Sequence, residues 1–457
     1  MFGKASPLER ALQNRALAGH VEGTEESPEA RLTRMLSTQS VVSTASSFAT
    51  RQQEAATDTS VPFREIGTGS IGKVFEHPGT VFVYKLPLSD KPEKLWNNYV
   101  MHKRVQYSFQ KLPYLEGQVE VPRCFWYGTP ATSAFWNEHL ERFPDTPQFP
   151  RQPRHVLCME RVFPLPQPIR HALVDKFCPP QARDSIKESE ANKDCLIRPC
   201  LGRLKYGAGA SFFSLRNFIL HSNQIHELGL NVSELNIGMA HALAVLHWHT
   251  NIDAKDVEFV LGSSPVEGQM VRSDVDISRL LSLKTVTSTY EETTHAAADF
   301  TKRATSLWLL DFDDCEDITL DEKGVDKAVK AFLDTNFYCP KPNTGNDFIE
   351  SAWKVFSAKY VVLSDKILRK ERGLMHLSKL PRLFISKINE KTAIRRQQQP
   401  EAQPTSQAPP RGGGTGARAQ GSIGPSRSQR GRGSGRARGH GRGHGPGHGP
   451  DRGPWRS

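Results

Sequence analysis

The chain has 457 residues, seven cysteines and a formal net charge of +11. This length would allow two or three domains, but both ends lack the large apolar residues that a core requires. Ser, Thr, Ala, Gln and Glu dominate residues 1–60, and Gly, Arg, Pro, Gln and His dominate residues 389–457. Neither composition can offset the entropy of ordering a chain. We therefore expect one globular domain between two disordered tails.

The positive charge belongs to the C-terminal tail. Residues 391–457 hold 13 Lys and Arg against 2 acidic residues, so residues 1–390 hold 47 basic and 47 acidic side chains. The high pI is therefore no evidence that the domain itself binds nucleic acid. Only the tail is a candidate for binding polyanions.

The cysteine pattern indicates a reducing compartment, which means the cytoplasm or the nucleus. The chain has no C-x-x-C pair and no apolar run of 18 residues, and its N-terminus does not resemble a signal peptide. We therefore expect no zinc site, no membrane partner and no membrane span.

In chain order, the domain begins with strands and continues with helices. A β-rich part with one helix is predicted over 61–163, with strands at 63–66, 73–75, 81–85, 119–127 and 155–161 and the helix at 91–110. A mostly helical part is predicted over 164–388. It has loops and short helices at 164–232, a buried helix at 233–248, strands at 258–261 and 307–310, and helices over 324–388.

The first candidate site lies in the glycine-rich turn between the first two strands. Gly67, Gly69 and Gly72 form a G-x-G-x-x-G pattern, and Lys85 ends the apolar strand 81–85. Because a strand and not a helix follows the glycines, the pattern suits a hairpin lying over nucleotide phosphates, with Lys85 on the α- and β-phosphates. A glycine-rich hairpin with an ordinary edge lysine remains the alternative.

Two acidic segments complete the candidate site. Asp253, Lys255 and Glu258 lie between the buried helix and a strand, where Asp253 could act as a base, Lys255 could neutralise a phosphoryl group and Glu258 could bind Mg²⁺. Asp311 follows the strand 307–310, as the second metal-binding acid of a phosphotransferase does. Either segment could instead be a solvated polar turn. Their order along the chain is that of a protein-kinase-like, two-lobed α+β domain.

Several motifs resemble a fungal domain-of-unknown-function family whose members are often called zinc-finger-like proteins. The resemblance spans roughly residues 60–372, and its motifs include 192–198, 213–218, 242–248, 256–262 and 307–312. The family has no established activity, so the resemblance implies a relative without implying a function.

A more distant resemblance concerns aminoglycoside and choline kinases. Their metal-binding motif is similar to the sequence Leu-Leu-Asp-Phe-Asp around Asp311, which implies ATP and Mg²⁺ as cofactors. The sequence departs from protein kinases at Asn251 and Ile252, where the pair His-Arg is usual, and at Glu258, where a metal-binding Asn is usual. Asn97 and Asn98 stand where a lysine-pairing Glu is expected. These departures put phosphate transfer in doubt.

The tail offers a second kind of chemistry. Residues 411–457 repeat Arg-Gly units, which keep the chain flexible while presenting planar charged groups to phosphates and bases. We expect either RNA or general polyanion binding, or a merely solubilising tail. For the whole chain three hypotheses stay open: a phosphotransferase, a non-catalytic module of the same fold recruited to RNA through the tail, and an RNA-associated protein whose domain makes only protein contacts.

Overall fold

The structure is a computed structural model that describes most of the chain between residues 60 and 398. The described residues are 30, 32–33, 36, 41–43, 51–52, 54–56, 58, 60–89, 92–113, 115, 119–205, 213–216, 218–265, 277–283, 286–291, 300 and 302–398. The chain divides into two compact units, 1–400 and 401–457. The Arg-Gly segment 411–457 lies outside the described residues, so the following concerns the first unit.

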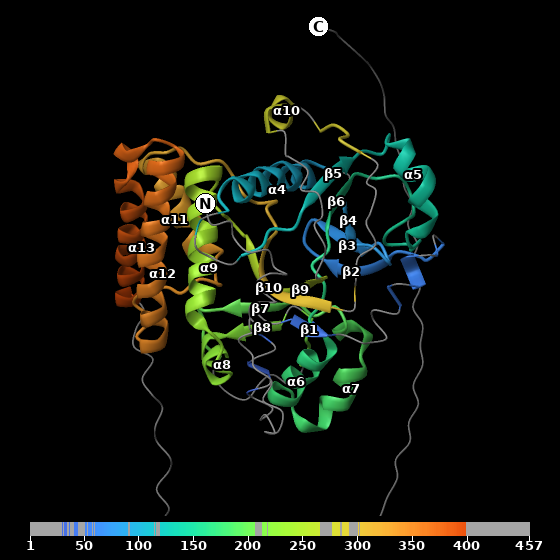
Figure 1. Ribbon diagram of the computed structural model, residues 1–457, viewed down its shortest axis with the longest axis horizontal. Helices are drawn as coiled ribbons and strands as arrows, with labels where there is room; N and C mark the ends of the chain where they lie inside the picture. Colours follow the sequence, from blue (N-terminus) through green and yellow to red (C-terminus); the bar gives the residue numbers. More distant parts are fainter. Residues whose placement is uncertain are drawn as a thin grey trace, which may run out of the picture. The chain divides into compact units, whose positions relative to one another are not determined.

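The described residues form a mixed α/β architecture with two five-stranded sheets (Figure 1). The first sheet has the order β2 (Arg64–Thr68), β3 (Gly72–Glu76), β4 (Phe82–Pro87), β6 (Val156–Glu160) and β5 (Cys124–Gly128). The second has the order β1 (Val41–Ser43), β10 (Lys302–Leu310), β9 (Glu258–Pro265), β7 (Ile197–Cys200) and β8 (Phe218–His221). All named strand pairs are antiparallel except β7 with β8.

Helices pack beside both sheets. The helices near the first sheet and along the middle of the chain are α4 (Glu93–Lys111), α5 (Ser133–His139), α6 (Gln167–Phe177), α7 (Arg183–Glu188), α8 (Ser222–Glu227) and α10 (Ile277–Ser282). In Figure 1 the remaining helices stand side by side at one side of the second sheet, and they are α9 (Val232–Val245), α11 (Glu322–Asp334), α12 (Asp347–Lys366) and α13 (Lys379–Gln398). No helix among the described residues is long and apolar enough to cross a bilayer.

The two faces of the first sheet differ in chemistry, because successive strand residues point to opposite faces. Phe75, Tyr84 and Trp126 share one face and belong to a buried aromatic cluster that α5 covers. Lys85 lies on the opposite face, opposite Val74 in the neighbouring strand β3. The alternation of strand β4 therefore places one charged side chain on the face that looks away from the aromatic core.

Helix α9 is the centre of the larger core, as its apolar spacing predicted. Leu235, Met239, Leu243 and Leu246 are all buried in one cluster with residues of α11, α12 and α13. The Asn231 side chain accepts a hydrogen bond from the backbone N–H of Glu234 and so caps the start of the helix. The helix then continues as one π-helical turn over Leu246–Thr250, which leads directly into the loop that carries Asp253.

The expected disorder of residues 1–60 does not extend to all of that segment. Leu32 and Leu36 are each 2% exposed and belong to the large core, and Val41–Ser43 pairs with β10. Residues 55–56 pack against the turn at Gly79, whose φ is +78°. A few apolar residues in a polar segment are enough for docking when a folded domain already offers the complementary surface.

Two further boundaries differ from the prediction. Helix α13 runs to Gln398, ten residues past the predicted end at 388, because its contacts continue: the Asn343 amide donates to the Asn389 carbonyl at 3.0 Å and to the Thr392 hydroxyl at 2.9 Å. The region 164–232 was predicted as loops and short helices but contains β7 and β8. Pro199 makes β7 hard to predict, since proline is unusual inside a sheet. In the structure the backbone of β7 pairs with β9 at Ile197 only.

Candidate functional site

Lys85 and Asp311 meet between the two sheets. The Lys85 Nζ lies 2.9 Å from Asp311 Oδ1 and 3.8 Å from Asp313 Oδ2. Lys85 is nearly buried, with a side chain 9% exposed, whereas the Asp311 side chain is 37% exposed. The Lys85 ammonium is therefore held by the carboxylates of Asp311 and Asp313, and Asp311 is still accessible to solvent.

Helix α4 supplies two amide side chains that bind this acidic segment. The Asn98 amide donates to Asp311 Oδ1 at 3.2 Å. The Asn97 amide donates to the carbonyls of Asp313 and Cys315 at 2.8 and 3.0 Å. The two asparagines that looked like departures from a kinase pattern thus bind the loop after β10, and Asn98 shares Asp311 with Lys85. No sequence pattern predicts this role for the two asparagines.

Glu258 lies next to Asp311 across the second sheet, because β9 and β10 pair Glu258 with Leu310. Its carboxylate accepts a hydrogen bond from Arg198 at 2.7 Å. Burial raises the pKa of Glu258 to about 6, with Asp311 and Asp256 adding to the rise and Arg198 opposing it. Arg198, on the unpredicted strand β7, is a site residue that sequence reasoning missed.

Asp253 is buried and organises the loop that follows α9. Its Oδ1 accepts hydrogen bonds from the backbone N–H groups of Lys255 at 3.1 Å and Glu316 at 3.0 Å. The residue is 2% exposed, and burial raises the pKa of its carboxyl group. The Lys255 ammonium lies 3.8 Å from Asp314 Oδ2. This loop is therefore joined to the acidic segment after β10 by both backbone and charge.

Backbone strain gathers at these two segments. Among the described residues, five that are not glycine have a positive φ, and four of them are Asn251, Ala254, Asp256 and Asp311, with φ between 55° and 61°. This conformation is uncommon for residues with a Cβ and is maintained only when the surroundings demand it. Backbone strain of this kind often occurs at functional sites, so it supports the two loops that carry Asp253 and Asp311 as the candidate site.

The three glycines form a hairpin turn but have different surroundings. The Gly69 N–H donates to the Gly72 carbonyl at 2.9 Å, and none of the three has a positive φ. A Cβ at Gly72 would lie 2.5 Å from the Leu86 carbonyl oxygen, so this glycine permits the close approach of β3 and β4. A Cβ at Gly69 would meet nothing nearer than 3.9 Å. Packing thus explains Gly72 but not Gly69.

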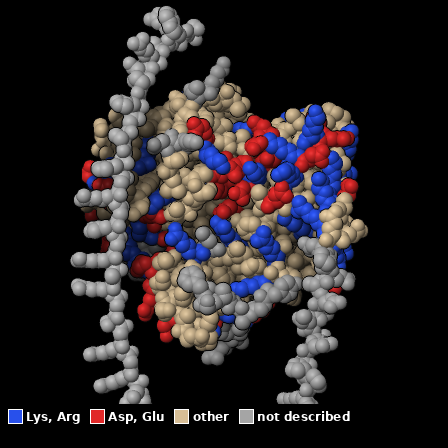
Figure 2. All heavy atoms as spheres, turned by 180° about the vertical axis from the view of Figure 1, so that it is seen from behind, with Lys and Arg blue, Asp and Glu red and all other residues tan. Residues whose placement is uncertain are grey.

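The site is acidic overall, because seven carboxylates lie in the two short segments 253–258 and 311–316, together with Lys255 and next to Lys85. Burial raises the pKa of Asp313 to about 6, and Asp311 adds to the effect while Lys85 opposes it. In Figure 2, Asp and Glu side chains gather near the middle of the face shown, with Lys and Arg around them. A cation, alone or bound to phosphates, would relieve such repulsion.

The donor set fits Mg²⁺ only together with a further ligand. In the part of the chain that is described, no three His, Cys, Asp or Glu side chains form a group that could hold a metal ion alone. Mg²⁺ is commonly bound by one or two carboxylates plus the phosphates of a substrate. Asp311 and Glu258 match that smaller set, with Asp311 the more exposed of the two.

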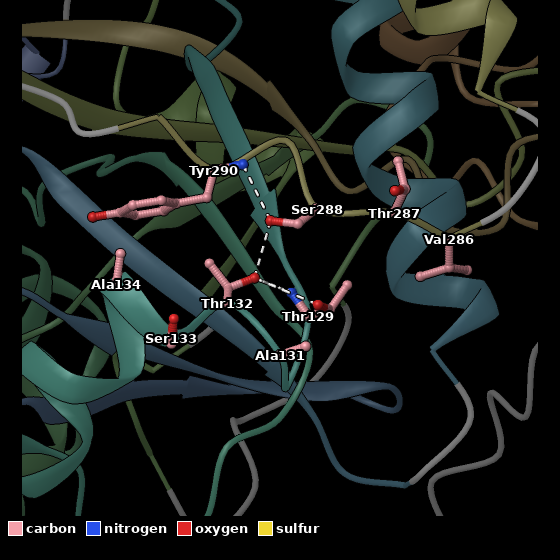
Figure 3. A pocket seen from close by; sticks show the side chains of 9 residues that line it. All are labelled: Thr129, Ala131, Thr132, Ser133, Ala134, Val286, Thr287, Ser288 and Tyr290. Atoms are coloured by element: carbon pink, nitrogen blue, oxygen red, sulfur yellow. Dashed lines mark hydrogen bonds between the residues drawn. The ribbon is translucent and has the colours of Figure 1, made fainter.

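A hollow of about 510 Å³ lies elsewhere, between the turn at 129–134 and residues 286–290 (Figure 3). Hydroxyl groups and small apolar side chains line it, and no charged residue does. The Thr132 hydroxyl donates to the Ser288 hydroxyl at 2.9 Å across it. None of the eight predicted site residues belongs to its wall.

The comparisons with known proteins are limited to one segment. No curated protein and no solved structure matches the chain. A family profile described as "Zinc finger protein" matches residues 307–372, which include Asp311, Asp313 and the whole of α12. All seven cysteines are buried and free of disulfides. Over residues 307–372, and over that segment alone, the chain is therefore similar to domain-of-unknown-function family 3669.

Proposed function

We propose that the chain binds a nucleotide with Mg²⁺ at the site between its two sheets, in a protein-kinase-like arrangement. The observation that carries this proposal is the ion pair between Lys85 and Asp311, which are 226 residues apart in the chain. Lys85 comes from the sheet with the glycine hairpin, and Asp311 from the sheet that carries Glu258. A phosphate chain is the ligand that uses a fixed ammonium, a magnesium-binding carboxylate and a glycine turn together.

Each residue has a specific role in this proposal. Lys85 binds the α- and β-phosphates, and Asp311 exchanges part of its contact with Lys85 for the Mg²⁺ that accompanies them. Glu258 is the second carboxylate for the ion, for which it must loosen its bond to Arg198. The open position at Gly69 lets the backbone of the hairpin approach the phosphates, whereas Gly67 and Gly72 shape the turn.

Binding is better supported than phosphate transfer. A general base must reach the hydroxyl that it deprotonates, but Asp253 is 2% exposed and its Oδ1 already accepts two backbone hydrogen bonds. We therefore propose a nucleotide-binding module and treat transfer to a hydroxyl, with Asp253 as base and Lys255 beside the phosphoryl group, as a separate outcome.

The test is calorimetric titration of the full chain with ATP and Mg²⁺, beside Lys85→Met, Asp311→Asn and a control, Lys387→Met. The control also removes a lysine from an ion pair, the one with Asp326 at 2.6 Å on the far helices. Loss of a charge-assisted hydrogen bond costs about 1.5–3 kcal/mol, which is about a 10- to 100-fold loss of affinity. We expect that loss at Lys85 and Asp311 and none at Lys387.

Absence of binding by the parent chain would refute the nucleotide site. Equal affinities of the parent, Lys85→Met and Asp311→Asn would place the nucleotide elsewhere. Circular dichroism of each variant separates a folding defect from a binding defect. ATP hydrolysis or transfer to a hydroxyl compound by the parent would favour the phosphotransferase over the binding module.

The tail supports a second, independent proposal. We propose that residues 411–457 bind RNA, because they carry 10 Arg against 1 acidic residue in a Gly-rich sequence. Binding of this kind weakens steeply with salt, since each neutralised phosphate releases counterions. Deletion of 401–457 should abolish binding of a single-stranded RNA in a filter assay at low salt. RNA binding that survives the deletion would contradict the proposal.

A further inference from the structure

Two described stretches, 277–283 and 286–290, lie against helix α4 and strand β5. They belong to the long connection between β9 and β10, whose strands carry Glu258 and lead to Asp311. Leu280 is 6% exposed and packs in a cluster with Leu95 and Tyr99 of α4, and Ile277 and Leu283 pack against the same cluster. We call residues 277–283 and 286–290 together the strap.

The strap also covers the outer edge of β5, which ends the first sheet. The Thr289 N–H donates to the Tyr127 carbonyl at 2.8 Å, and the Tyr127 N–H donates to the Thr289 hydroxyl at 3.0 Å. A side-chain oxygen thus replaces one backbone acceptor of a true strand pair. The Tyr290 ring packs edge-on against Trp126, with ring centroids 4.8 Å apart.

Thr289 joins this edge to helix α4. Besides accepting from Tyr127, its hydroxyl donates to the Tyr99 hydroxyl at 2.8 Å. Tyr99 follows Asn98, whose amide binds Asp311. The same turn of α4 therefore contacts both the strap and the candidate site.

Figure 3 shows that the strap residues Ser288 and Tyr290 face the turn that carries Thr132. Ser288 is exposed; its hydroxyl accepts hydrogen bonds from the Thr132 hydroxyl at 2.9 Å and the Tyr290 N–H at 3.4 Å, and donates to the Tyr127 carbonyl at 3.5 Å. The hollow beside these contacts means that part of the strap is not closely packed against the sheet. Thr289 is therefore the point at which the strap is tied most firmly, through two side-chain bonds and one backbone bond.

We propose that Thr289 is a positioning residue that holds α4 in place and so sets the geometry of Asn98, Asp311 and Lys85. The effect of Thr289 on nucleotide binding rests on the proposed nucleotide site, but its effect on the position of α4 can be tested without a ligand. When Thr289 loses its hydroxyl, Tyr99 and the Tyr127 N–H lose their common partner, and α4 can move away from the acidic segment.

The first experiment is hydrogen exchange, read by mass spectrometry, on the full chain and on Thr289→Val. Valine keeps the shape of threonine and removes only the hydroxyl. Thr287→Val is the matched control, because Thr287 lies in the same strap and lines the hollow. Loss of one hydrogen bond of typical strength corresponds to about a fivefold faster exchange. We expect this for amides of α4 and β5 in Thr289→Val, and recovery in Thr289→Ser.

The second experiment is titration of the same three variants with ATP and Mg²⁺. We expect Thr289→Val to bind about fivefold more weakly, and Thr289→Ser and Thr287→Val to bind as the parent does. Unchanged exchange of α4 in Thr289→Val relative to Thr287→Val would overturn the proposal. If the parent binds no nucleotide, the proposed function fails, while the exchange result still decides whether the strap positions α4. Faster exchange with unchanged affinity would overturn the link to the site.

Discussion

Gly72 and Gly69 offer a sharp test, because they belong to the same turn but differ in surroundings. In Gly72→Ala the new Cβ would lie 2.5 Å from the Leu86 carbonyl oxygen. Strands β3 and β4 would have to separate locally by roughly 0.9 Å to reach ordinary van der Waals contact. Crowding of this kind costs about 1–3 kcal/mol. In Gly69→Ala nothing lies nearer than 3.9 Å to the new Cβ, and the φ is not positive.

We therefore expect Gly72→Ala to lower the free energy of unfolding by about 1–3 kcal/mol, and Gly69→Ala to leave it unchanged or raise it by about 0.4–1 kcal/mol. The assay is urea unfolding followed by tryptophan fluorescence. Gly69→Ala should nevertheless weaken binding of ATP and Mg²⁺, because its methyl group would lie where the phosphates approach. Equal loss of stability in the two variants would show that the turn differs from the one described. Full nucleotide affinity in Gly69→Ala would argue against phosphate contact by the hairpin.

Three further predictions concern buried polar groups. The pKa of Glu258 is raised from 4.5 to about 6, so the folded protein binds this proton more tightly than the unfolded chain does. The free energy of unfolding should therefore fall by about 2 kcal/mol as the pH rises from 4.5 to above 6. Urea unfolding of Glu258→Gln should lack that part of the pH dependence. Tyr360→Phe removes the hydroxyl that contacts His247 at 2.8 Å and Trp248 at 2.9 Å. The free energy of unfolding in urea should fall by about 2–4 kcal/mol. A change near zero would contradict these two hydrogen bonds. Arg161 is 1% exposed and forms an ion pair with Glu76, which is 4% exposed. Arg161→Met should cost about 3–5 kcal/mol because it leaves the buried Glu76 carboxylate short of a partner, and removing that carboxylate as well should recover most of the loss in a double-mutant cycle.

Much of the local structure could be predicted from the sequence because it depends on neighbours in the chain. The run of β-branched and aromatic residues in 81–85 identifies a strand, and the 3.6-residue spacing in α9 identifies a helix and its buried face. The strand-borne Asp311 and the strand lysine were likewise visible as candidates, since each follows an apolar strand. Their meeting at 2.9 Å could only be anticipated from the order of the segments, because it depends on how two sheets pack.

What the sequence could not reveal depends on distant partners. Strand β7 is short and contains Pro199, and it is stable because β8 and β9 flank it. No pattern in the sequence therefore predicts the hydrogen bond between Arg198 and Glu258. Asn98 looked like a departure from a kinase motif until the structure placed Asp311 beside it. Leu32 and Leu36 stand in a polar segment, and only the folded core explains their burial.

Strand β1 has a consequence for any shortened form of the protein. Val41–Ser43 pairs with the outer side of β10 and ends the second sheet there. A chain that starts at residue 61 would leave Lys302–Ala304 of β10 with unpaired backbone N–H and C=O groups. Such an edge is a template for strand addition between molecules. We therefore expect the shortened protein to self-associate in light scattering, and a chain retaining residues 30–60 to stay monodisperse under the same conditions.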